Sequence, residues 1–249
     1  MNDASHPHFH FRLVPFLVAV FLAFGLPYIA SEAIDTGRHY SHIIPGFADT
    51  LRWTYAQHTV WLILSVIAIA IAVRVVPADY GLHRPEDKSY LPSAIVSGVV
   101  FGVLMAAVDY APNILAHTAP KLDYPLTVGS VLGRLGFNGL YAGLTEEVPF
   151  RALLVTYLAT AMPGKWHAGR FAISGGAVVA SGIWAFYMAG FTSAPLAVAF
   201  GQWVVQFLFG VVLAYWLEQS KSVLAPIVGH NVSGATEYGL VLLMVMLWA

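Results

Sequence analysis

Long apolar runs are the feature that most constrains this chain. A helix needs about 20 mostly apolar residues to cross roughly 30 Å of hydrocarbon, because every backbone polar group must find its partner inside the helix. The 249 residues are 58% hydrophobic and only 10% charged, whereas soluble domains are about half apolar and about a quarter charged. The mean hydropathy of +0.71 agrees with this bias. The sequence therefore predicts an all-α, polytopic membrane helix bundle.

About eight transmembrane helices are expected from these runs. The runs cover residues 13–30, 60–76, 91–108, 126–144, 148–162, 171–190, 195–217 and 223–248. The first exceeds the roughly 7–15 residues of a signal-peptide apolar region and is interpreted as an anchor, although Ser31 and Ala33 also resemble a cleavage site. The last suits one tilted helix or two pieces broken near Gly234. Between the runs we expect a polar loop over 32–58 and an exposed connection over 109–125.

Charge and composition exclude several classes of function. The formal net charge is -1, so no basic patch for a nucleic-acid partner is expected. Cysteine is absent, which excludes disulfides, thiolate metal sites and a cysteine nucleophile. Motifs of zinc proteases, rhomboid-like or presenilin-like proteases and P-loop proteins are missing, so neither a metal nor a cofactor is expected. We predict one integral membrane domain over 1–249, with an N-terminal tail at 1–12. The charges of the loops do not determine the orientation of this domain in the bilayer.

The few ionisable groups inside apolar sequence are the candidates for function. A charge in mid-bilayer costs at least about 2.5–3.5 kcal/mol, so such groups need partners. The densest group is Glu146, Glu147 and Arg151. On a helix, Glu147 and Arg151 share one face at i, i+4 in the favourable order. Glu146 points about 100° away and stays available for other chemistry.

Pro149 lies within this group and predicts a local boundary. Proline is tolerated in the first helical turn, so a helix is expected to begin near Glu146, with both carboxylates at the positive end of its dipole. A carboxylate held there within reach of a histidine can act as a general base on water. Two alternatives remain open at this point. The acidic group could be a structural ion pair at an interfacial helix start, and His230 could be a hydrogen-bonded core residue.

The second half of the chain, residues 126–249, resembles the CPBP family of CAAX prenyl endopeptidases and bacteriocin-processing or Abi-type intramembrane proteases. The resemblance rests on the family's Glu-Glu-x-x-x-Arg motif, present as Glu146, Glu147 and Arg151. The Phe-x-x-x-His motif begins at Phe186 but ends at Gly190, and the His-x-x-x-Asn/Asp motif begins at His230 but ends at Gly234.

The resemblance implies a polar cavity in the membrane and peptide-bond hydrolysis by glutamate-activated water. It makes Glu146 the general base, Glu147 and Arg151 the groups that hold the site, and His230 the oxyanion or water-orienting group. Asn231 and Glu237, close to His230 in sequence, are candidates for replacing the missing groups, and Phe186 of the incomplete motif is a third auxiliary candidate. The implied partners are the bilayer and a membrane-embedded or membrane-associated peptide or protein, and the implied location is the plasma (inner) membrane of a prokaryote.

Two other functions remain compatible with the sequence. The glycines at 190 and 234 suit a catalytically inactive relative that binds a membrane peptide or a partner protein. The ionisable groups inside apolar segments, Arg134 among them, also suit a small transporter or a proton-relay protein.

Overall fold

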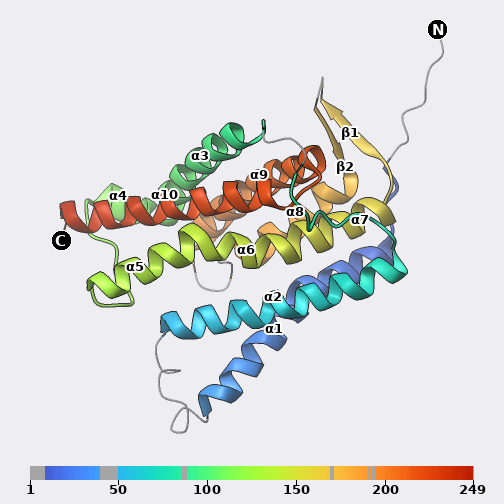
Figure 1. Ribbon diagram of the computed structural model, residues 1–249. Coiled ribbons are helices and arrows are strands. Elements are labelled where there is room, and N and C mark those ends of the chain that lie inside the picture. Colours follow the sequence, from blue (N-terminus) through green and yellow to red (C-terminus); the bar gives the residue numbers. More distant parts are fainter. Residues whose placement is uncertain are drawn as a thin grey trace.

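The protein is a helix bundle with one short β-hairpin, seen in a computed structural model (Figure 1). The structure describes residues 9–39, 50–85, 89–168, 171–189, 191 and 194–248. The elements in chain order are α1 (Leu13–His39), α2 (Thr50–Val75), α3 (Leu91–Asp109), α4 (Ala111–Ala116), α5 (Val128–Gly136), η1 (Phe137–Tyr141), α6 (Ala142–Glu147), η2 (Val148–Val155), α7 (Thr156–Ala161), β1 (Lys165–Ala168), β2 (Phe171–Ser174), α8 (Gly175–Met188), α9 (Leu196–Ser220) and α10 (Leu224–Trp248). Residues 1–8 of the expected tail and Gly190 lie outside the described residues.

Five of the described helices, α1, α2, α3, α9 and α10, are long and apolar enough to cross a bilayer. Their outer faces expose large apolar side chains, among them Phe21 on α1, Ile71 on α2 and Val96 on α3. Contiguous apolar surface of this extent is unfavourable in water and favourable against lipid. The chain is therefore an integral membrane protein built of helices, and the expected number of eight crossings is not reached by these helices alone.

The segment 128–161 forms one continuous helix instead of the two expected spans at 126–144 and 148–162. This composite helix consists of α5, η1, α6, η2 and α7, where η1 and η2 are π-helical stretches. Thr127 caps its start, since its hydroxyl oxygen accepts a hydrogen bond from the Ser130 N–H. Pro149 lies at the start of η2, where the wider π pattern accommodates a residue that lacks an N–H. The expected boundary near Glu146 was therefore wrong.

The polar loop expected over 32–58 is shorter than predicted, because α1 extends to His39 and α2 already begins at Thr50. Polar side chains of the two helices pair with each other. Trp53 Nε1 donates to Asp35 at 2.9 Å, and Gln57 Nε2 donates to Ser31 at 3.1 Å. These hydrogen bonds allow polar residues to continue both helices instead of forming a loop.

The expected span at 171–190 is divided between a strand and a short helix. β1 and β2 pair antiparallel, with Lys165 opposite Ser174. The Ser174 hydroxyl then caps α8 by accepting from the Ala177 N–H at 3.0 Å. The remaining helix has 14 residues, which is shorter than the roughly 20 that a full crossing needs. The fold is thus helical with two short strands, and the prediction of an all-α chain holds only in part.

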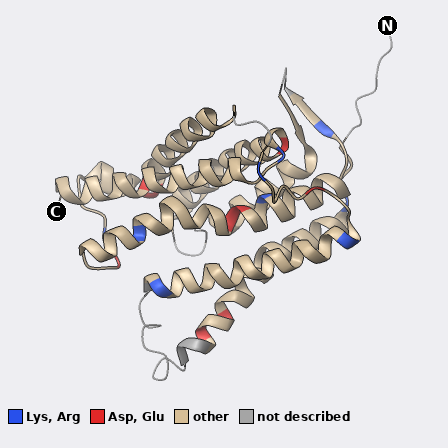
Figure 2. Ribbon diagram, in the orientation of Figure 1, with Lys and Arg blue, Asp and Glu red and all other residues tan. Residues whose placement is uncertain are grey.

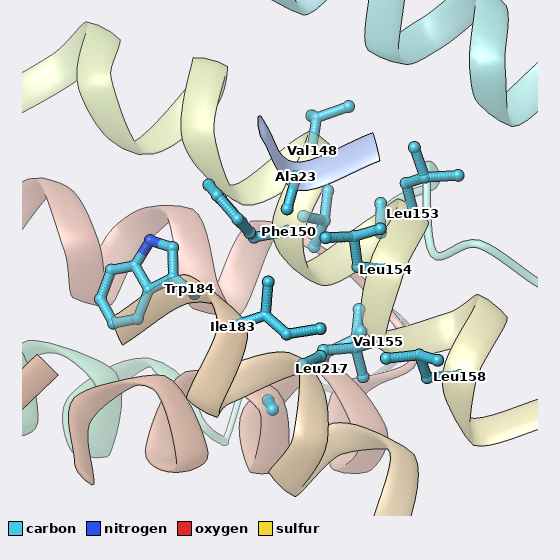
Figure 3. Packing of buried hydrophobic residues seen from close by; sticks show 14 of the residues in the cluster. Ala23, Val148, Phe150, Leu153, Leu154, Val155, Leu158, Ile183, Trp184 and Leu217 are labelled. Carbon is cyan, nitrogen blue, oxygen red and sulfur yellow. The ribbon is translucent and has the colours of Figure 1, made fainter. Parts of the chain in front are cut away.

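The helices form layers around the composite helix (Figure 1). α3, α9 and α10 lie together on one side of it, while α2 and then α1 lie on the other. Figure 3 shows the packing between η2 and α8, where Phe150 and Leu154 face Ile183 and Trp184. Helix packing in lipid relies on close van der Waals contact, and a glycine allows it where α3 crosses α10. A Cβ at Gly102 of α3 would lie 2.5 Å from a backbone oxygen of α10.

Candidate active site

The two adjacent carboxylates lie midway along the composite helix, where Figure 2 shows acidic residues far from either end of that helix. Glu146 and Glu147 are the last residues of α6, and their exposed fractions are 7% and 0%. The helix already runs through Ala142 and continues into η2. The expected stabilisation by a helix N-terminus is therefore absent, and the charges must be balanced by side chains.

Glu147 is held from two sides. Its Oε1 accepts a hydrogen bond from His230 Nδ1 at 2.7 Å, and its Oε2 lies 3.2 Å from Arg151 Nε. The Glu147 side chain is 0% exposed, Arg151 1% and His230 12%. The i, i+4 pairing predicted for Glu147 and Arg151 is present. A carboxylate this deeply buried keeps its charge only with such partners, so α10 and the composite helix are joined at this point.

Arg151 lies against an aromatic ring as well as a carboxylate. Its guanidinium carbon is 4.2 Å from the centre of the Trp184 ring. The cation–π attraction is strongest for tryptophan and increases when water is excluded. The Trp184 ring centre is also 6.3 Å from that of His230. Trp184 therefore packs against both the guanidinium of Arg151 and the imidazole of His230.

Glu146 faces a cavity of about 140 Å³ instead of the ion pair. The same cavity is lined by His230, Gln206, Asn138, Glu237 and Phe209. Glu146 Oε2 lies 3.9 Å from His230 Nε2, and no group within the described ranges hydrogen bonds to this oxygen. A cavity of this size and polarity admits water. Glu146 thus lines a space that it shares with the imidazole of His230, and its Oε2 is buried without a hydrogen-bond partner in the described part of the chain.

The three auxiliary candidates have different surroundings. Asn231 lies on α10, where its oxygen accepts from the Gly143 N–H at 2.9 Å and its Nδ2 donates to the Leu140 carbonyl at 3.1 Å. It connects α10 to backbone groups at η1 and α6. Glu237 lines the cavity and lies close to the carboxyl group of Asp109 on α3. Phe186 is 56% exposed, and its ring packs against those of Phe24 and Phe191.

Gly234 lies on the cavity wall in the middle of an unbroken α10, so the alternative of two shorter pieces is excluded. A Cβ at this position would be 2.5 Å from the carbonyl oxygen of Asn138 in η1. The backbones of α10 and η1 are in direct contact here. This contact leaves no space for the Asn or Asp side chain that the family motif has at this position.

Other polar residues reach the site that the sequence did not single out. His58 of α2 has its Nδ1 2.9 Å from the hydroxyl of Thr145, the residue before Glu146. Gln206 of α9 and Asn138 of η1 bring amide groups to the cavity. A polar residue inside an apolar run was the available signal for the two amides. His58 gave no such signal, because it fell at the end of the expected loop.

Arg134, the remaining ionisable residue singled out from the sequence, lies apart from this group. Its Nη2 is 3.0 Å from Asp123 Oδ2, and its guanidinium carbon is 5.0 Å from the Tyr124 ring centre. In the described part of the chain, no three His, Cys, Asp or Glu side chains are grouped closely enough to hold a metal ion. The site therefore consists of acids, an imidazole, a guanidinium and amides.

The fold and the site together define a helical membrane protein with two buried carboxylates, one of which lines a cavity together with a histidine. Its residues 129–235 match the family model of the type II CAAX prenyl endopeptidases, Rce1-like. The matched region contains Glu146, Glu147, Arg151 and His230. The match confirms the resemblance to the CPBP family, whose Rce1-like members are intramembrane proteases. No curated protein and no solved structure matches the chain.

Proposed function

We propose that this chain is an intramembrane glutamic endopeptidase that cleaves a membrane-associated peptide or protein. The observation that carries the proposal is the position of His230, which lines one cavity together with Glu146 and hydrogen bonds to Glu147. We place the enzyme in the plasma membrane of a prokaryote, the setting suggested by the resemblance to bacteriocin-processing and Abi-type proteins.

Glu146 is the general base of the proposed reaction. It takes a proton from water while the water oxygen adds to the carbonyl carbon of the scissile peptide bond. The same proton then goes to the amide nitrogen as the carbon–nitrogen bond breaks, which gives a carboxylic acid and an amine; transfer of the acid proton to the amine leaves a carboxylate and an ammonium group. The place of the Glu146 carboxylate on the cavity wall suits this role. The reaction consumes one water molecule and needs no covalent intermediate.

Glu147, Arg151 and His230 provide the fixed charges around this base. Glu146 and Glu147 carry two negative charges, which Arg151 and a protonated His230 balance. With Nδ1 bound to Glu147 at 2.7 Å, the imidazolium has its Nε2–H directed to the side of Glu146. A donor held in place before the reaction stabilises a developing oxyanion without reorganisation. Glu147 and Arg151 act through His230 and are positioning residues.

The test replaces Glu146 by Gln in the full chain reconstituted in lipid vesicles. The substrates are membrane-anchored peptides, including one with a prenylated C-terminal cysteine motif, and the readout is cleavage by mass spectrometry. We expect Glu146→Gln to abolish cleavage while the unfolding midpoint stays near that of the native protein. Glu32→Gln, an exposed carboxylate on α1, is the matched control and should cleave normally. Undiminished cleavage by Glu146→Gln would refute the mechanism.

The closed packing at Gly234 favours one second candidate, a peptide-binding relative without turnover. The chain lacks the amide side chain that the family motif has at position 234. Loss of one oxyanion donor typically lowers the rate about 10²- to 10³-fold. This candidate predicts saturable binding of the anchored peptides with no cleavage in the native chain. Cleavage that depends on Glu146 excludes it.

A further inference from the structure

A buried amide on α9 faces the same cavity as the acidic pair. Gln206 is 8% exposed and lines the cavity together with Glu146 and His230. These three side chains come from three different elements, α9, α6 and α10. The amide therefore lies on a wall of the cavity that the motif residues do not supply.

The Gln206 side chain makes no hydrogen bond to the described residues. Gln202, one turn earlier on α9, donates to Asp109 at 2.9 Å. For Gln206, by contrast, no partner occurs among the residues that the structure describes. Buried polar side chains are normally paired, and an exception calls for an explanation such as a ligand or a catalytic role. Its two N–H donors are thus available to a group inside the cavity.

We propose that Gln206 is a catalytic residue whose Nε2 donates a hydrogen bond to the carbonyl oxygen of the scissile peptide bond. The inference rests on the proposed function. The carbonyl oxygen gains negative charge as water adds, and amide side chains are established donors to such oxyanions. Gln206 provides the amide that position 234 cannot hold, because a side chain there would meet the Asn138 backbone.

The decisive variant is Gln206→Leu, which keeps the size of the side chain and removes both donors. We expect kcat to fall about 10²- to 10³-fold with little change in KM, the effect of losing a donor that acts in the transition state. Gln219→Leu is the matched control, since Gln219 is an exposed glutamine on the same helix. It should leave both constants unchanged.

A binding measurement separates catalysis from folding. A peptide phosphinate mimics the tetrahedral intermediate, whereas an uncleaved N-methylated peptide of the same sequence mimics the substrate. Gln206→Leu should weaken phosphinate binding about 100-fold and leave binding of the N-methyl peptide unchanged. Equal losses for both ligands, or a native kcat, would overturn the proposal. A loss of phosphinate affinity in Asn138→Ala instead of Gln206→Leu would assign the donor to Asn138 and overturn it as well. Cleavage that survives Glu146→Gln refutes the proposed function separately.

Discussion

A side chain at position 234 is predicted to separate two helices that now touch. In Gly234→Ala, the new Cβ would lie 2.5 Å from the carbonyl oxygen of Asn138, about 1 Å closer than the roughly 3.5 Å of a relaxed contact. The neighbouring atom is backbone, so it cannot rotate away as a flexible side chain would. Inserting a methyl group into such a packed site costs about 1–3 kcal/mol. The helix propensity of alanine offsets about 0.5–1 kcal/mol of this cost.

Gly239→Ala on the same helix is the matched control. A Cβ at this position meets nothing within 4 Å, so only the propensity gain of about 0.5–1 kcal/mol remains. The free energies of unfolding of the two variants should therefore differ by about 1–3 kcal/mol, with Gly234→Ala the less stable. Denaturant unfolding in one detergent, followed by tryptophan fluorescence, measures this difference. Equal stability of the two alanine variants would show that α10 and η1 are not packed at this distance.

The same contact predicts the outcome of restoring the family motif. Gly234→Asn should lower cleavage instead of raising it, because separating α10 from η1 also withdraws His230 from the acidic pair. A rise in kcat for Gly234→Asn, measured with the anchored peptides, would contradict the packing argument.

Three further predictions test the surroundings of the site. Asn231→Leu should destabilise the fold by about 1–3 kcal/mol, because two backbone groups lose their partner; denaturant unfolding measures this, and an unchanged midpoint contradicts it. Arg151→Leu leaves the buried Glu147 without its guanidinium and should cost about 3–5 kcal/mol in the same assay, whereas a neutral result would show that the ion pair contributes nothing. Outside the spans, hydrogen bonds from His83 and a backbone N–H lower the pKa of Asp79. This stabilisation is complete above about pH 4, the unfolded-state pKa, and is lost as the pH falls through the folded-state pKa; Asp79→Asn should remove that acid dependence of the unfolding midpoint.

Local sequence was sufficient for several parts of this structure. The apolar runs located α3, α9 and α10 with ends close to those observed, because a helix in lipid must be apolar over its whole length. The pairing of Glu147 with Arg151 followed from their i, i+4 spacing, which is a property of one helix. The assignment of His230 to the site followed from the resemblance to a family motif and not from spacing or composition.

Tertiary packing decided the rest. It directs His230 Nδ1 to Glu147, 83 residues away in the chain, and leaves Glu146 facing the cavity. It also carries the composite helix through Pro149 and brings Gln206 of α9 to the same cavity. Sequence periodicity describes which residues share a face of one helix, whereas these contacts depend on how helices distant in sequence approach each other. At Gly234 that approach brings the backbones of α10 and η1 into contact. The distance between these two helices therefore decides that position 234 has no room for an amide side chain.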